Sequence, residues 1–241
     1  MISLEPLIFS LGRIENLMHK VSFNPLKMEG KIITNTSVVR KDVLDQTLRI
    51  FYNVIESGLA VSPLIAVELD GERAKIRTAC SITLDGVLLK NGVPIRPKGG
   101  GVIEVENREP VRFTDMLMYR ATTIDPIDVL ISQELTCVSR MMETGSGRIL
   151  GNLQEAPMVA RERIEGVLDN LADVGFSGVL ELGDPNMDVL GVSVERDHVG
   201  IGLVGGTNIV AAVVERGIEI WNESISDMTD VKDMKHVEEL I

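Results

Sequence analysis

Two glycine-rich segments carry residue types that can hold an anion. One reads KGGG over residues 98–101, and the other reads GGTN over residues 205–208. Successive backbone N–H groups in such turns can point at one negatively charged group. Lys98 adds a cation to the first turn, and Thr207 or Asn208 can cap a helix that follows the second. The alternative is that the glycines only permit a tight turn or a close approach of strands.

A polar stretch, TACSIT over residues 78–83, can supply hydroxyl groups to the same ligand. In a strand, alternation places Thr78 and Cys80 on one face, and Ser81 and Thr83 on the other. Either face could line a polar pocket, so both pairs are candidates. Cys80 is expected to be a buried thiol rather than a nucleophile, because no histidine lies near it in the sequence.

The segment GIGLVGG over residues 200–206 matches the G-x-G-x-x-G pattern, and Glu219 follows at about the distance of a ribose-binding acid. The alternative function is therefore a nucleotide- or dinucleotide-binding α/β enzyme. Against it, the motif begins at residue 200 of 241, its helix must end at Gly217, and the earlier glycine segment lacks the pattern. The motifs of serine hydrolases, zinc proteases and P-loop proteins are absent. We expect no enzyme, no metal site and no cofactor.

An internal repeat organises the elements that must position these residues. Residues 30–59 align with residues 147–176, with identical residues at five positions, among them Asn35 and Asn152. A second block aligns residues 93–109 with residues 199–215 and so pairs the two glycine segments. We predict a mixed α/β fold of two pseudo-repeated strand–helix–strand lobes, residues 30–146 and 147–241, after a helical or linker segment, residues 1–29.

Local patterns place the individual elements. Apolar spacing predicts helices over residues 7–21, 44–55 and 164–171, and Gly58 and Gly175 suit the ends of the last two. Pro157 suits the first turn of the second-lobe helix, and Asp125 suits the cap of a short helix over residues 125–132. Further predicted elements are a hairpin of residues 61–69 and 74–84, a strand over residues 135–142 and a helix over residues 208–216.

The composition excludes several classes of function. The net charge is −12, so the chain is not expected to bind the nucleic-acid backbone directly. Aromatic residues make up only 3% of the chain, which argues against a base-stacking platform. Two cysteines are too few for a disulfide scaffold, and neither a signal peptide nor a membrane-length apolar run is found. We expect a cytoplasmic protein.

Four segments together resemble the effector-sensing domain of the archaeal nitrogen-regulation repressors (NrpR): TACSITLDGVLLKNGVPIRPKGGGV, PVRFTDMLMYRATTIDPIDVL, GSGRILGNLQEAP and HVGIGLVGGTNIVAAVVERGI. The resemblance runs over about residues 30–231. It implies one regulatory domain of a transcriptional repressor of nitrogen assimilation, with 2-oxoglutarate as effector. The family's winged helix-turn-helix domain is not found here, so the resemblance implies contact with DNA only through such a domain or a partner repressor. Dimers are common among such regulators, and we expect a homodimer.

A small dicarboxylate requires hydrogen-bond donors rather than an aromatic slot. A cleft between the two lobes could switch by closing around it. Three positions depart from the family pattern: Gly99 stands where an aromatic residue is usual, Gln154 where Arg is usual, and Ile209 where Pro is usual. The candidate effector-binding residues are Thr78, Cys80, Ser81, Thr83, Lys98, Gly99, Gly100, Gly205, Gly206, Thr207 and Asn208.

Overall fold

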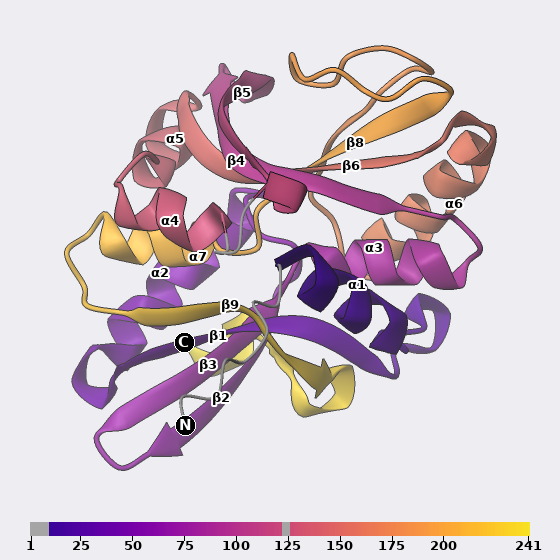
Figure 1. Cartoon of the computed structure of the whole chain (residues 1–241). Coiled ribbons are helices and arrows are strands. Elements are labelled where there is room, and N and C mark those ends of the chain that lie inside the picture. Colours follow the sequence, from indigo (N-terminus) through magenta and orange to yellow (C-terminus); the bar gives the residue numbers. More distant parts are fainter. Residues whose placement is uncertain (1–9, 122–125) are drawn as a thin grey trace, which may run out of the picture.

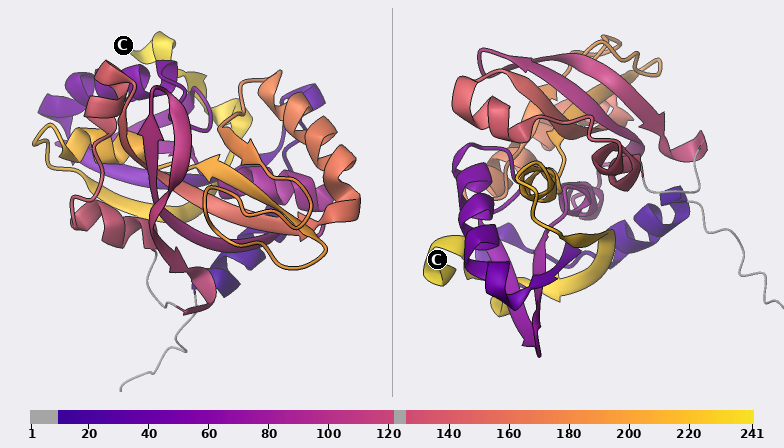
Figure 2. Two further views of the ribbon diagram at one scale, coloured as in Figure 1. Left: turned by 90° about the horizontal axis from the view of Figure 1, so that it is seen from above. Right: turned by 90° about the vertical axis from the view of Figure 1, so that its left-hand side faces the viewer.

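Two five-stranded antiparallel sheets lie above and below a set of helices (Figure 1). The structure, a computed structural model, describes residues 10–121 and 126–241. Helices α3 and α7 lie between the two sheets, and Figure 2 shows the same layers from two further sides. The mixed α/β prediction is confirmed. No helix in these two ranges is both long and apolar enough to cross a membrane.

The order of elements is repeated along the chain. The first half contains β1 (Lys31–Arg40), α2 (Leu44–Glu56), β2 (Leu64–Asp70), β3 (Arg73–Ala79), α3 (Ile82–Lys90), β4 (Arg96–Glu106) and β5 (Glu109–Met118). The second half contains β6 (Gly147–Pro157), α6 (Arg161–Ala172), β7 (Val179–Leu182), β8 (His198–Val204), α7 (Asn208–Val214) and β9 (Trp221–Asp230). Helices α1 (Ser10–Lys20), α4 (Pro126–Ser132) and α5 (Val138–Thr144) and strand β10 (Lys235–His236) lie outside this order.

The two halves exchange strands. One sheet has the order β10-β2-β3-β1-β9 and the other has the order β5-β4-β6-β8-β7. Strand β9 of the second half pairs with β1 of the first, and β4 of the first half pairs with β6 of the second. Each sheet therefore contains strands of both halves: β9 and β10 join the first-half sheet, and β4 and β5 join the second-half sheet. Both halves thus line the interior between the sheets.

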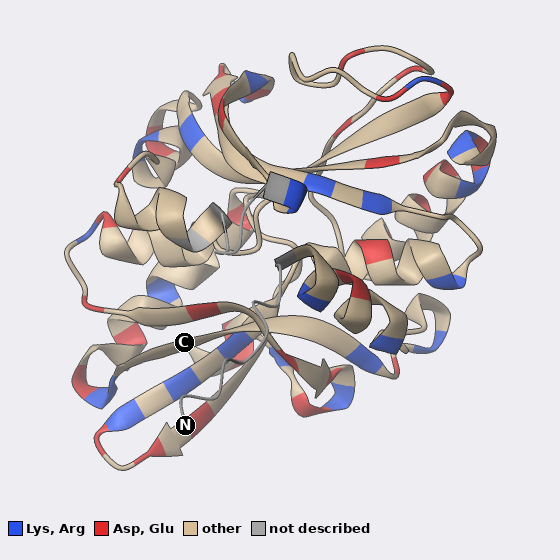
Figure 3. Cartoon of the chain, viewed as in Figure 1, with Lys and Arg blue, Asp and Glu red and all other residues tan. Residues whose placement is uncertain are grey.

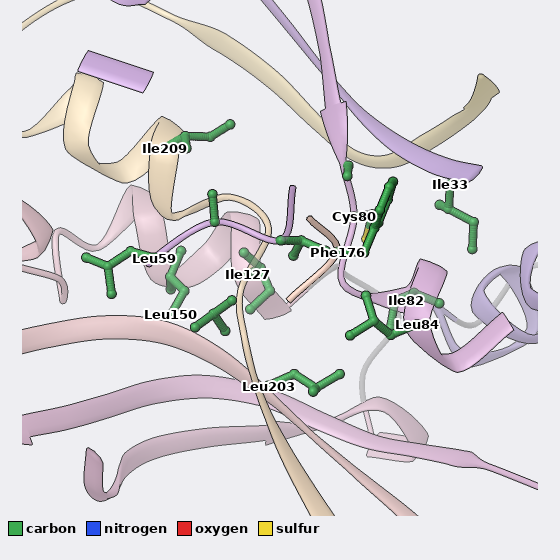
Figure 4. Close-up of a cluster of buried hydrophobic side chains, with 14 of the residues drawn as sticks. Ile33, Leu59, Cys80, Ile82, Leu84, Ile127, Leu150, Phe176, Leu203 and Ile209 are labelled. Carbon is green, nitrogen blue, oxygen red and sulfur yellow. The ribbon is translucent and has the colours of Figure 1, made fainter. Parts of the chain in front are cut away.

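The core follows from the apolar stripes of the helices and the buried faces of the strands. Thr47, Leu48, Phe51 and Val54 form the buried side of α2, and Ile164, Val167, Leu168 and Leu171 form that of α6. A close-up of part of the core shows apolar side chains from both halves converging, among them Leu59, Phe176 and Ile209 (Figure 4). Charged residues of both signs are interspersed along the surface, for example on the β2–β3 hairpin (Figure 3).

Several local predictions are confirmed. The hairpin forms with its turn after Asp70, and the helices predicted around residues 44–55, 125–132, 164–171 and 208–216 are present. Gly58 and Gly175 follow helix ends with positive φ. Helix α1 lies within the predicted N-terminal helix, whose first residues fall outside the described part of the chain, as does the proposed cap Asp125.

Other predictions are wrong. Strand β3 ends at Ala79, so that Ser81 and Thr83 lie at the start of a helix rather than on a strand face. Residues 138–144 form helix α5 instead of a strand, and Pro157 ends β6 instead of beginning a helix. Residues 135–142 form a short and largely apolar run, in which periodicity alone does not separate a strand from a buried helix.

The first glycine segment is not a turn. Gly99, Gly100 and Gly101 lie inside β4 and pair with both β5 and β6. A side chain on Gly101 would lie 2.2 Å from Asp115 O, so glycine here permits a close approach of strands. The second block of the predicted repeat is therefore misaligned: β3–α3–β4 corresponds to β8–α7–β9, and the partner of Gly205–Gly206 is Cys80–Ser81.

Candidate functional site

The two strand-to-helix turns, β3–α3 and β8–α7, meet at a small buried cavity. Its volume is about 20 Å³, which is room for one water molecule. Residues from both halves line it: Asn35, Cys80, Ser81, Ile82, Tyr119, Ile127, Asn152, Gly205, Gly206, Thr207, Ser224 and Ile225. In Figure 4, the labelled Cys80, Ile82 and Ile127 lie within the surrounding apolar cluster. A small cavity lined by polar and apolar residues of both halves therefore lies within the core.

Equivalent side chains fix the two turns to the sheets. Thr83 Oγ1 accepts from Ile33 N at 3.1 Å and donates to Ile33 O at 3.0 Å. In the second half Asn208 Oδ1 accepts from Leu150 N at 2.7 Å, and its Nδ2 donates to Leu150 O at 3.1 Å. Both candidates thus position the turns rather than line the cavity.

The first-half turn is closed by a chain of hydrogen bonds. Ser81 Oγ donates to Asn152 Oδ1 at 3.0 Å, and Asn152 Nδ2 donates to Tyr119 Oη at 2.6 Å. All three residues are buried. Buried polar groups need such partners, because an unsatisfied one carries a desolvation cost.

The second-half turn lacks the corresponding bond. Asn35, which is equivalent to Asn152, accepts from Ile225 N through Oδ1 at 2.9 Å. Its Nδ2 has no hydrogen-bond partner among the residues that the structure describes, and neither does Thr207 Oγ1. Gly206 stands where the first half has Ser81, and its ideal Cβ position would lie 3.1 Å from Asn35 Nδ2. The cavity therefore carries two buried donor groups without acceptors.

Two residues beyond Asn152 on β6, the buried amide of Gln154 contacts the buried acid Asp85. Gln154 Nε2 donates to Asp85 Oδ2 at 3.3 Å across the interface of α3 and β6. Both residues are wholly buried. Burial raises the pKa of Asp85 well above its usual value, and the bond from Gln154 opposes that only in part.

Lys98 lies in a different place. Its Nζ pairs with the carboxylate of Glu155 and donates to Ser193 O at 2.5 Å, within a shallow pocket that Arg96, Arg120 and Glu195 also line. Arg96 donates to Glu195 at 2.7 Å and holds the pKa of that exposed carboxyl below its usual value. The structure does not bring Lys98 to the cavity.

The remaining candidates divide between the cavity and its surroundings. Cys80, Ser81, Gly205, Gly206 and Thr207 line the cavity. Gly100 lies beside it on β4, where a Cβ would meet Ile127 at 2.9 Å and Tyr119 Oη at 3.3 Å. Thr78 is buried opposite Asn35 in the sheet register, and its Oγ1 has no partner in the described structure. Gly99 lies within β4, outside the cavity lining.

Sequence reasoning missed seven lining residues: Asn35, Ile82, Tyr119, Ile127, Asn152, Ser224 and Ile225. A signal for two of them was present, because Asn35 and Asn152 are an identical pair in the first block of the repeat. The other five come from separate elements, which no local pattern brings together: Ile82 begins α3, Tyr119 follows β5, Ile127 lies in α4, and Ser224 and Ile225 lie in β9.

The dinucleotide alternative is contradicted by the fold. Gly200 and Gly202 lie within β8, which pairs antiparallel with β6 and β7, whereas a dinucleotide fingerprint requires a parallel βαβ unit. Side chains at these glycines would meet Val189 and Leu190. Glu219 lines an open groove with Arg40 and Trp221 instead.

Comparisons with known proteins agree with this architecture. A family model described as NrpR regulatory domains NRD1 and 2 matches residues 7–236. A protein of Methanosarcina mazei named global nitrogen regulator NrpRI is 33% identical over 237 residues, which are 95% of this chain and 73% of that protein. The global nitrogen regulator NrpR of Methanocaldococcus jannaschii is 31% identical over 232 residues, and this chain spans 40% of its length.

A solved structure is also similar. The crystal structure of a nitrogen repressor-like protein from Methanococcus jannaschii superposes with a TM-score of 0.84 at 30% identity and covers 94% of this chain and 97% of that one. Both curated relatives are named as global nitrogen regulators. The chain therefore belongs to the family of NrpR regulatory domains.

Proposed function

We propose that this chain is the effector-sensing domain of a nitrogen-responsive transcriptional repressor and that it binds 2-oxoglutarate at the cavity between the two turns. The observation that carries the proposal is this cavity inside the core, which borders the donor groups of Asn35 and Thr207 that have no hydrogen-bond partner among the described residues. Leaving such groups unsatisfied costs stability, so their retention in a core fits a ligand site.

The chemistry of the lining suits a small dicarboxylate. The amide of Asn35 and the hydroxyl of Thr207 offer hydrogen-bond donors, and Gly205 and Gly206 line the cavity without side chains. Tyr119 is the one aromatic residue among the lining residues that the structure describes, whereas nucleotide bases commonly stack on aromatic side chains.

Binding must change the conformation of the domain. A cavity of about 20 Å³ holds one water molecule, so 2-oxoglutarate enters only if the two turns move apart. Because these turns join β3 to α3 and β8 to α7, their movement displaces elements of both halves. A ligand that prefers the opened state shifts the population towards it, which is the property that an effector requires.

Repression would then be controlled at a distance. With a net charge of −12, the chain is unsuited to hold DNA itself. In the proposed arrangement a winged helix-turn-helix domain or a partner repressor contacts the operator, and a homodimer of this cytoplasmic regulator matches a palindromic site.

Titration calorimetry and thermal unfolding with 2-oxoglutarate test this proposal. A ligand at a hundredfold excess over Kd adds about 2.7 kcal/mol to the free energy of unfolding. A matched pair of variants locates the site: Cys80→Ala, in the cavity lining, should weaken binding, and Cys137→Ala, at the start of α5, should not. No heat and no shift at millimolar 2-oxoglutarate, or a shift with NAD(P) instead, contradicts the proposal.

A further inference from the structure

The two ends of the cavity are related by the repeat but differ chemically. At the first-half turn, Ser81 donates to Asn152, and Asn152 donates to Tyr119. At the second-half turn, Gly206 has no hydroxyl to offer Asn35. One end is closed by its own hydrogen bonds, and the other end is open to a further acceptor.

The open end presents two donors from different halves of the chain. Asn35 is 1% exposed and lies on β1, where Oδ1 is already occupied by Ile225 N, so that only the amide N–H groups remain. Thr207 is 3% exposed and immediately precedes α7, without a side-chain capping bond. Both side chains border the same cavity.

We propose that Asn35 Nδ2 and Thr207 Oγ1 together bind one carboxylate of the effector and so fix which end of the ligand lies at the second-half turn. This assignment rests on the proposed function. Two neutral donors suit a carboxylate, because hydrogen bonds to an ionised acceptor are the stronger ones and the two oxygens can each accept.

The assignment explains why Gly206 differs from Ser81. A side chain at Gly206 would meet Ala79 O at 2.8 Å and would occupy the space in front of Asn35. The same position in the first half carries the Ser81 hydroxyl, which donates to Asn152 Oδ1, and Asn152 Nδ2 donates to Tyr119 Oη. The two ends of this pseudo-symmetric pocket therefore differ, and only the second-half end binds a carboxylate.

Calorimetry with 2-oxoglutarate on three variants of the whole chain tests the assignment. Thr207→Val removes the hydroxyl at constant shape, and we expect affinity to fall about tenfold. The Tm of this variant should stay equal to or rise above that of the wild type, because the lost hydroxyl has no partner in the described part of the chain. Asn35→Asp keeps the acceptor for Ile225 N and removes the donor, and it should weaken binding by at least about tenfold.

Thr47→Val is the matched control. Its hydroxyl is equally buried but donates to Val43 O at 2.9 Å within α2, away from the cavity. We expect this variant to lower Tm and leave affinity unchanged. Thr207→Val binding within about twofold of wild type overturns the assignment even if Asn35→Asp fails to fold. A wild type that binds no 2-oxoglutarate overturns the proposed function and this inference together, whereas binding that the variants leave unaltered overturns this inference alone.

Discussion

Gln154 Nε2 donates to Asp85 Oδ2 at 3.3 Å, and this contact ties helix α3 of the first half to strand β6 of the second in the interior of the protein. Asp85 Oδ1 and Gln154 Oε1 have no partners in the described structure. A proton on Asp85 turns one of these two acceptors into a donor. Together with burial, this favours the neutral acid in the folded state.

The free energy of unfolding should therefore fall as the pH rises. The folded pKa of Asp85 lies above the unfolded value, so its contribution is fully present below the unfolded pKa and is lost as the pH rises through the folded pKa. Between those two values the slope approaches about 1.4 kcal/mol per pH unit, because one proton is released on unfolding. Urea unfolding at a series of pH values measures it.

Asp85→Asn is the corresponding variant. Its amide can accept from Gln154 Nε2 and donate to Gln154 Oε1 without a titratable proton, so it should raise stability at neutral pH and flatten this slope. Asp45→Asn, in the exposed first turn of α2, is the control and should follow the wild-type profile. Parallel profiles for wild type and Asp85→Asn would show that Asp85 does not titrate across this range.

The hydroxyl of Thr83 should be required to hold the first turn on β1. Thr83→Val removes both hydrogen bonds to Ile33 and leaves the buried N–H of Ile33 unsatisfied. We expect the free energy of unfolding to fall by about 1–3 kcal/mol. Thr83→Ser keeps the hydroxyl and should retain most of the stability. Denaturant midpoints compare the two, and equal losses in both variants would assign the effect to the methyl group instead.

Glycines in the sheet and in a helix should respond oppositely to alanine. At Gly151 a Cβ would lie 2.1 Å from Ile103 Cδ1 and 2.9 Å from Leu203 O, so Gly151→Ala should cost about 1–3 kcal/mol through overpacking. Gly166 is exposed within α6 with open space around it, so Gly166→Ala should add about 0.5–1 kcal/mol. Thermal unfolding of both variants checks the opposite signs.

Lys98 should matter for stability and not for the effector. Lys98→Met leaves the buried carboxylate of Glu155 without its cation, and roughly 3–5 kcal/mol of stability should be lost. Because Lys98 does not line the cavity, 2-oxoglutarate affinity should be unchanged. Lys90→Met, at the exposed end of α3, controls for loss of a charge. A loss of 2-oxoglutarate affinity in Lys98→Met but not in Lys90→Met would show that Lys98 contributes to effector binding.

The sequence predicts those parts of the fold that follow from local periodicity. The stripes of α2 and α6, the hairpin and the first block of the repeat could be found because each depends on spacing within one segment. The strand character of residues 98–101 could not, because it depends on β5 crossing within 2.2 Å of where a side chain would lie. For the site, the turn residues could be named in advance, while Tyr119 and Ser224 reach the cavity only through tertiary packing.

The exchange of β4 and β9 restricts the motions that are open to the domain. The halves cannot part about a single hinge, since any wide separation would tear β4 from β6 and β9 from β1. Movement that admits a ligand must instead be a twist of one sheet against the other, distributed over the two crossing connections through α3 and α7. Such a twist would rotate the edge strands β5 and β10 relative to each other, so that an event in the core would reach an edge of each sheet.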